Sequence, residues 1–135
     1  MLISTRGRYA LRVVADLAEH NDGNYIPLKE ISSRQEISLK YLEGIMTELS
    51  KAGIVEGLHG KGGGYKMAVT PEKCTVKSIL EITEGSLSPV TCLVKQENDC
   101  PRKEKCLTLS MWEDLYKLIS DFFANKTIKD LIKNK

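Results

Sequence analysis

The sequence lacks the features that would place it in a membrane or outside the cell. No run of apolar residues approaches the roughly 20 needed to span a bilayer as a helix. The first residues, MLISTRGRYALRVV, hold neither a long apolar block nor a small-residue cleavage site, so we expect no signal peptide. Four cysteines in 135 residues are too few for the disulfide framework of a secreted protein. These absences favour the cytoplasm as the compartment of the protein.

A strong charge imbalance is also missing. The 20 lysines and arginines exceed the 18 aspartates and glutamates by only two, so the net charge of +2 does not argue for nucleic-acid binding. Any basic patch must be local. The sequence shows no catalytic triad, nucleotide loop or substrate-pocket motif, so we do not expect an enzyme. Its length suffices for one core without disulfide staples, either as one domain or as a small domain with an appendage.

Hydrophobic periodicity predicts three helices in the first half of the chain. Tyr9, Val13 and Leu17 recur at four-residue spacing, which indicates a helix over residues 5–20. Pro27 precedes a second, short helix over residues 28–35. Ser38 is a typical N-cap for a third helix that ends at Gly53. The expected buried stripe of this third helix consists of Leu39, Leu42, Ile45, Met46 and Leu49.

Glycines and short apolar runs predict a hairpin next. The segments IVEGLH and YKMAV flank GKGGG, and a short helix should follow over residues 75–83. The cysteine-rich segment is expected to be a loop, and a long helix should run over residues 107–123. Thr127 and Asp130 resemble a capping box for a terminal stub. The long helix carries an apolar stripe that we expect to form a dimer, which comprises Met111, Leu115, Leu118, Ile119 and Phe122, widened by Trp112, Tyr116 and Phe123.

The order of these elements predicts a mostly α fold with a small β wing. Three helices followed by a glycine-tipped hairpin is the order of a winged helix-turn-helix domain, whose third helix enters the major groove of DNA. We expect this DNA-binding domain over residues 1–84, a cysteine-bearing loop over residues 85–106, and a long C-terminal dimerisation helix with a terminal stub over residues 107–135.

The hairpin tip carries the local positive charge. His59, Lys61 and Lys66 surround four glycines, and glycine lets backbone N–H groups approach a phosphate closely. A plain turn needs only one or two glycines, so four favour contact with phosphate or with a groove. The positive residues of the first helix are interpreted as a solvated face; they are Arg6, Arg8 and Arg12. On the third helix, Glu43 either accepts a hydrogen bond from cytosine N4 or simply faces solvent.

Three cysteines lie close together in the second half of the chain. Seven residues separate Cys92 from Cys100, and five separate Cys100 from Cys106. Thiolates are the usual ligands of 2Fe–2S and 4Fe–4S clusters, whereas structural zinc sites favour cysteine pairs two to four residues apart. The neighbouring cations favour both metal binding and oxidation of the thiols; they are Lys95, Arg102, Lys103 and Lys105. Cys74 stands apart and is interpreted as a small, partly buried residue.

Several stretches together resemble the IscR-like iron–sulfur cluster regulators. They are STRGRYALRVVADLA, ISLKYLEGIMTELSKAGIVEGLHGKGGGYKMA, the spaced cysteines and CLTLSMWEDL, and the resemblance covers almost the whole chain. It implies a winged helix that dimerises through the long C-terminal helix and whose DNA binding changes with cluster status. It places the cluster ligands on Cys92, Cys100 and Cys106. It places the DNA contacts on Ser38, Lys40, Tyr41, Glu43, His59 and Lys61, and so favours base reading by Glu43.

Two departures from the family pattern leave the fourth ligand open. Many relatives carry a histidine three residues after the last cysteine, where this chain has Leu109. Others use an acidic residue near the N-terminus, where this chain has Arg8. The remaining possibilities are a residue from a second subunit, a small molecule, or a loop carboxylate such as Glu97, Asp99 or Glu104. His59 also stands where arginine is common, so its charge depends on pH.

We therefore expect a homodimeric transcription regulator that binds a pseudo-palindromic site in double-stranded DNA and responds to an iron–sulfur cluster. One alternative is a cluster-free regulator of the same family that senses thiol oxidation or a partner protein. An alternative from another class is a small iron–sulfur electron carrier whose winged helix binds a protein.

Overall fold

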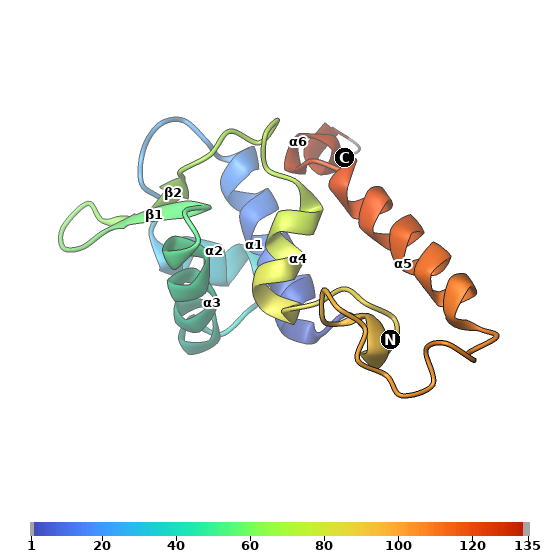
Figure 1. The fold of residues 1–135 in the computed structure, drawn as a ribbon. Helices are drawn as coiled ribbons and strands as arrows, with labels where there is room; N and C mark the ends of the chain where they lie inside the picture. Colours follow the sequence, from blue (N-terminus) through green and yellow to red (C-terminus); the bar gives the residue numbers. More distant parts are fainter. Residues whose placement is uncertain (1, 134–135) are drawn as a thin grey trace.

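The computed structural model describes residues 2–133 and is mostly helical with one small sheet (Figure 1). The expected fold class is confirmed. The elements follow the order α1 (Thr5–Glu19), α2 (Leu28–Gln35), α3 (Leu39–Lys51), β1 (Val55–Leu58), β2 (Gly64–Met67), α4 (Val76–Glu84), the 3₁₀ turn η1 (Thr91–Leu93), α5 (Leu109–Ala124) and α6 (Ile128–Lys133). Within the described part of the chain, no helix is long and apolar enough to cross a membrane.

Local capping explains where the helices begin and end. The hydroxyls of Ser4, Ser38 and Thr75 each accept a hydrogen bond from a backbone N–H three residues later, at 3.0–3.2 Å. Helix α3 ends at Lys51, and Gly53 just beyond its C-cap has a φ of 79°, in the left-handed region that glycine adopts most easily. Thr127 and Asp130 bond reciprocally at the start of α6, so the expected capping box is confirmed.

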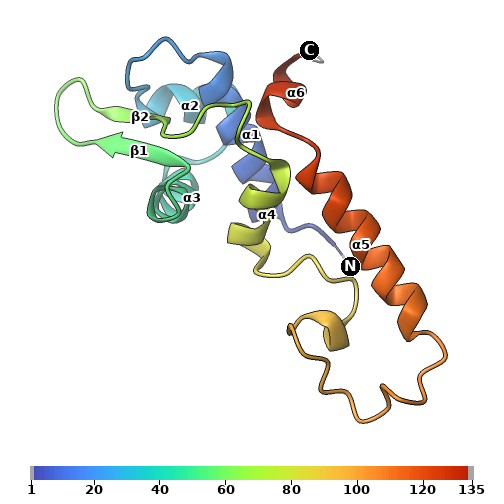
Figure 2. The same ribbon diagram turned by 45° about the horizontal axis from the view of Figure 1, so that its top comes forward.

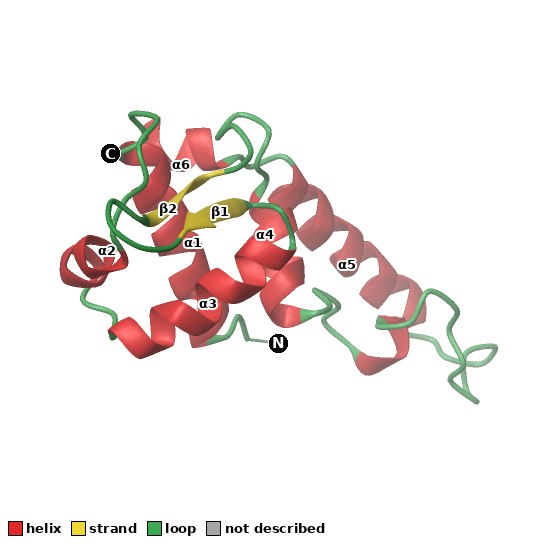
Figure 3. Cartoon of the chain, turned by 90° about the vertical axis from the view of Figure 1, so that its left-hand side faces the viewer, coloured by secondary structure: helices red, strands yellow, loops and turns green. Residues whose placement is uncertain are grey.

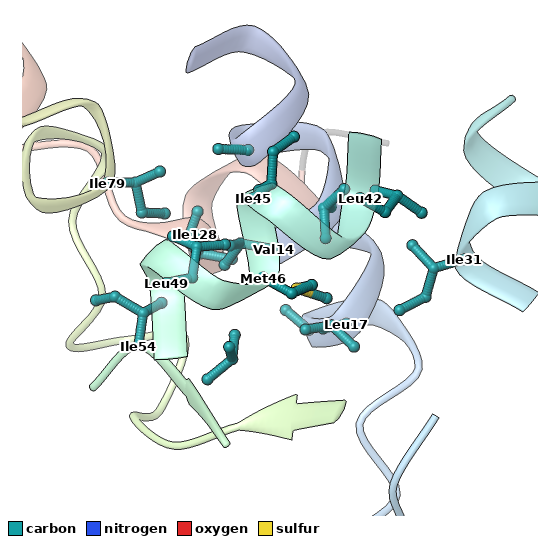
Figure 4. Close-up of a cluster of buried hydrophobic side chains, with 14 of the residues drawn as sticks. Val14, Leu17, Ile31, Leu42, Ile45, Met46, Leu49, Ile54, Ile79 and Ile128 are labelled. Carbon is teal, nitrogen blue, oxygen red and sulfur yellow. The ribbon is translucent and has the colours of Figure 1, made fainter. Parts of the chain in front are cut away.

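One hydrophobic core joins the first three helices to α4 and α6 (Figure 4). Val14, Leu42 and Met46 are fully buried at its centre. Ile128 of α6 is also fully buried in it, so the last helix packs on the first half of the chain. Leu39, expected in the buried stripe of α3, is 37% exposed. It is the first residue of the helix, and the first turn of the stripe extends past the core.

A smaller apolar cluster fixes α5 to α4; Figure 2 shows the ribbons of these two helices. Val76, Leu80 and Leu87 form its buried centre. The side chains that pack on this centre are Ile3, Leu11, Tyr116, Ile119 and Phe123. The apolar residues of α5 therefore divide between two faces. The outer face consists of Met111 (51% exposed), Leu115 (37%), Leu118 (69%) and Phe122 (58%).

Strands β1 and β2 form an antiparallel hairpin, which we call the wing, beside α3 (Figure 3). The register pairs Val55 with Met67 and Leu58 with Gly64. Tyr65 also exchanges two backbone hydrogen bonds with Ile26, at 2.8 and 2.9 Å, so β2 is held on both sides.

Candidate nucleic-acid interface and cysteine loop

Helix α3 separates its buried residues from a polar, exposed face. Leu42, Ile45, Met46 and Leu49 are buried, whereas the residues expected to contact DNA, Ser38, Lys40, Tyr41 and Glu43, are exposed. The Ser38 hydroxyl accepts from the N–H of Tyr41, which leaves its own proton to donate. This exposure is a condition for contact with DNA, and the contacts themselves stay predictions.

Side chains from α1 support Tyr41. The Tyr9 and Tyr41 rings meet edge to face with their centroids 5.5 Å apart. The Arg12 guanidinium lies 5.1 Å from the Tyr9 ring centroid and donates to the Gln35 side chain at 3.2 Å. Arg12 is exposed, as expected of a solvated face, but its long side chain also reaches α2.

The wing tip presents His59 and Lys61 to solvent. Lys66 does not belong to this tip. Its Nζ lies 3.4 Å from the Glu56 carboxylate and 4.7 Å from the centroid of the Tyr25 ring. The basic charge of the tip therefore rests on His59 and Lys61.

The wing glycines have structural reasons of their own. Gly60 and Gly62 have φ values of 91° and 79°, which side chains rarely adopt. A Cβ on Gly63 would lie 2.2 Å from the carbonyl oxygen of Leu58, and one on Gly64 would lie 2.1 Å from that of Ile26. The number of glycines therefore reflects the backbone path of the wing and does not by itself indicate phosphate contact.

Residues 85–108 join α4 to α5 and carry the three clustered cysteines, at the end of the molecule remote from the wing (Figures 1 and 2). We call this segment the cysteine loop. Leu87 is its one buried residue. Cys92, Cys100 and Cys106 are half-buried free thiols. Across residues 2–133, no three histidine, cysteine or acidic side chains gather as a metal site.

The cysteine loop fits an iron–sulfur cluster by its donor chemistry but not yet by its geometry. Three thiols on one polar segment are the right ligand type. The structure leaves them apart, so the loop would have to close to bring them together. Leu109 and Arg8, at the two positions where the resemblance leads one to look for a fourth ligand, have no suitable donor atom.

Cys106 lies just before α5 in surroundings that favour its thiolate. Its sulfur is 3.4 Å from the Thr108 hydroxyl. Hydrogen bonds from the hydroxyl and backbone N–H of Thr108 lower the pKa of Cys106, with smaller contributions from the Leu109 N–H and the positive charge of Arg102. By contrast, Cys74, expected to be partly buried, is only 1% exposed, and burial raises the pKa of its thiol.

A family of iron-dependent transcriptional regulators, Rrf2, matches residues 3–134. The chain belongs to the Rrf2 family. The HTH-type transcriptional regulator IscR of Vibrio campbellii is 37% identical over 134 residues, which are 99% of this chain and 79% of that protein. This family membership confirms the expected IscR-like, DNA-binding regulator class.

Two solved structures of this Rrf2 protein's relatives share its fold. IscR of T. potens superimposes with a TM-score of 0.79 and 33% identity, covering 99% of this chain and 88% of the other. CymR of B. subtilis, described as the global cysteine regulator, gives a TM-score of 0.81 with 27% identity and covers 100% and 98% of the two chains.

Proposed function

We propose that the protein is a cytoplasmic, non-enzymatic, homodimeric transcription regulator whose promoter binding responds to an iron–sulfur cluster held by Cys92, Cys100 and Cys106. The observation that carries this proposal is the position of the three thiols. They lie on a single loop that joins α4, which packs on the candidate DNA-binding elements, to α5, whose outer apolar face is exposed. The iron-dependent family description and the relatives named IscR support the cluster.

On the DNA side, α3 would enter the major groove and the wing would reach the adjacent backbone. Ser38, Lys40, Tyr41 and Glu43 occupy the exposed face of α3, while His59 and Lys61 occupy the wing tip. A two-fold dimer would present two such surfaces to a pseudo-palindromic operator in double-stranded DNA.

The outer face of α5 supports the dimer. Met111, Leu115, Leu118 and Phe122 are spaced by four, three and four residues, which is the seam spacing of paired helices. Next to this seam lies a shallow apolar hollow lined by Ile3, Leu118, Ile119, Phe122 and Phe123. A second copy of α5 would cover this surface.

The cysteine loop has the properties of a segment that a ligand orders. It contains one buried residue, and its apolar residues Val94 and Leu107 are 52% and 97% exposed, so it buries little apolar surface with which to fix its own path. A bound cluster supplies a redox-active group and a crosslink between the thiols. Binding of Cys92 and Cys106 to one cluster would fix the path of the chain from α4 to α5. It would thereby fix the placement of α3 and the wing in the two copies of a dimer.

A cluster-free regulator that senses thiol oxidation is the second candidate. Cys106 has a lowered pKa and the three thiols are not gathered, both of which suit reaction of a free thiolate with an oxidant. The similarity to CymR, described as a cysteine regulator, favours this second candidate.

One set of measurements separates these candidates. Protein purified without oxygen should be brown and should contain iron and sulfide. Loaded protein, apo protein and the Cys92→Ala/Cys100→Ala/Cys106→Ala variant are then titrated onto a panel of promoter duplexes, with Cys74→Ala as the control. We expect the loaded protein to differ from the other two by about 5–150-fold in affinity or site preference, the usual range of linkage.

Equal affinity and equal site preference of all three would overturn the sensing function. If iron-free protein instead changes its DNA affinity after peroxide treatment, and the triple variant does not, the thiol-oxidation candidate holds in place of the cluster.

A further inference from the structure

The first turn of α1 is attached to the last residue of α4. The backbone N–H of Ser4 donates to Glu84 Oε1 at 2.5 Å, and the Ser4 hydroxyl donates to Oε2 at 2.6 Å. The same hydroxyl accepts from the N–H of Gly7 at 3.0 Å, which caps α1. Glu84 is directly followed by Gly85, where the cysteine loop begins. The base of the cysteine loop is thus bonded to the start of α1.

This attachment is tight and charged. A Cβ on Gly7 would lie 3.1 Å from Thr83 Oγ1 and 3.2 Å from Glu84 Cδ, so α1 and α4 meet with little room to spare. Burial raises the pKa of Glu84, but the two hydrogen bonds from Ser4 and one from Thr83 together hold the pKa below its usual value. Ile3, one residue before, packs in the apolar cluster that joins α4 to α5.

Two residues after Ser4, Arg6 reaches α3. Its Nη2 donates to the carbonyl oxygen of Gly44 at 3.1 Å and pairs with the carboxylate of Glu48. Both contacts lie on the helix that exposes Lys40 and Glu43. The side chain of Arg6 is 33% exposed, so most of its surface is occupied within the molecule. Arg6 was expected to belong to a solvated face, and the structure corrects this.

The geometry points to residues 3–7 as a rigid link that carries the state of the cysteine loop to α3, with Arg6 as a positioning residue for base reading. This inference rests on the proposed function. Glu84 holds the link at the base of the loop, and Arg6 holds it at α3 through Gly44 and Glu48. Arg6 acts by orienting α3 and does not itself contact DNA.

Hydrogen exchange tests the link without DNA or cluster. Glu84→Gln removes the charge that binds Ser4, and Glu81→Gln is the control because Glu81 is an exposed residue of the same helix. We expect amides 42–46 of α3 to exchange at least about fivefold faster in Glu84→Gln, the low end of usual coupling, and to be unchanged in the control. Ser4→Ala removes one of the two bonds to Glu84 and the cap of α1, so it should also speed exchange of the same amides. Unchanged exchange of α3 in both Glu84→Gln and Ser4→Ala would overturn the link.

DNA binding tests the role of Arg6. Arg6→Gln and Arg8→Gln each remove one positive charge from the start of α1, but Arg8 is exposed and bonds only locally to Thr5. Arg6→Gln should change the ranking of duplexes that differ at single base pairs by about 5-fold or more, the low end of usual coupling. Arg8→Gln should change all duplexes equally, and Arg6→Lys should restore part of the ranking.

Equal effects of Arg6→Gln and Arg8→Gln across the panel would show that Arg6 contributes only its positive charge to DNA binding. The proposal that Arg6 positions α3 would then be wrong. If the unmodified protein binds none of the duplexes, the proposed function fails, and the exchange measurement still decides whether the link exists.

Discussion

Asp16 places a buried charge at the contact between α1 and α2. Its side chain is only 1% exposed. The guanidinium of Arg34 donates to the carboxylate at 2.7 and 3.0 Å, and the Gln35 amide donates at 2.8 Å. Burial raises the pKa of Asp16, but the hydrogen bonds from Arg34 and Gln35, together with the charges of Arg34 and His20, outweigh it, so the net pKa is lowered from its usual 3.8. A charged Asp16 therefore fixes the first helix of the helix-turn-helix pair.

We expect Asp16→Asn to lower the free energy of unfolding by roughly 2 kcal/mol at pH 7, since it removes charge-assisted hydrogen bonds. A lowered folded pKa stabilises the protein above the unfolded pKa, and this stabilisation disappears as pH falls through the folded value. The difference in free energy of unfolding between the variant and the unmodified protein should therefore stay constant down to about pH 4 and disappear below it. Urea unfolding from pH 7 to pH 2.5 measures this, with Asp114→Asn at an exposed position of α5 as control. A gap that persists at the lowest pH would contradict the assignment.

Lys61 and Glu43 should affect DNA binding in different ways. Lys61→Ala should weaken binding to all duplexes alike and flatten the salt dependence, because a phosphate contact carries no sequence information. Glu43→Ala should relax preference at one base pair by about 1–3 kcal/mol. Fluorescence anisotropy on a panel of duplexes at several salt concentrations separates the two patterns. Identical behaviour of the two variants would remove the distinction between the wing and α3.

The wing distinguishes two reasons for glycine. Gly62 needs its positive φ, yet an added Cβ there meets nothing within 4 Å. Gly64 combines a positive φ with the close approach to Ile26 that joins β2 to the rest of the molecule. Its lack of a side chain therefore maintains the bridge between Tyr65 and Ile26.

We expect Gly62→Ala to cost about 1 kcal/mol of stability, from backbone strain alone. Gly64→Ala should cost at least about 2 kcal/mol, because the new methyl group displaces the Ile26 backbone and breaks its hydrogen bonds with Tyr65. Urea unfolding of the two variants gives both values. Equal losses would mean that β2 can move away from Ile26 without penalty.

The helices and their ends were predictable from sequence because their causes are local. A cap lies within three residues of the group that it satisfies, and an apolar period lies within a single helix. The contacts of Arg6 and Arg12 were not predictable, since a helical period only assigns these residues to the outer side. A long side chain can then reach a helix that is distant in sequence, as Arg6 reaches Glu48.

Helix α5 shows the same limit for apolar residues. The expected dimer stripe included Ile119, and the expected wider surface included Tyr116 and Phe123. These three residues pack on the cluster of Val76, Leu80 and Leu87 within the same chain. Periodicity reveals how many apolar faces a helix has, but only the neighbouring helices decide which face is covered. The spacing of the three thiols in the sequence likewise cannot predict whether they come together, because the path of a loop depends on the groups that order it.

The whole molecule places its two candidate sites at opposite ends, with α1, α4 and α5 between them (Figure 2). The cysteine loop connects directly to α5, whose inner face packs on α4 and whose outer face is exposed. A change in the path of the loop therefore acts on α5 as well as on the contact of Glu84 with Ser4 at the other end of the loop. In a dimer, the angle of α5 sets the separation of the two α3 helices, and that separation must match the half-site spacing of the operator.

Leu118→Asp should convert the proposed dimer to a monomer, because it places a charge at the most exposed position of the α5 seam, where the partner's apolar face would bury it. Leu107→Asp, at an exposed leucine before the helix, adds the same charge outside the seam and should leave the dimer intact. Sedimentation at micromolar concentration gives both states. The monomer keeps α3 and the wing, so it should still bind a single half-site, but it should lose the dependence of affinity on half-site spacing. A Leu118→Asp protein that stays dimeric would show that another surface joins the two copies, and the route from the cysteine loop to operator spacing would then not pass through the outer face of α5.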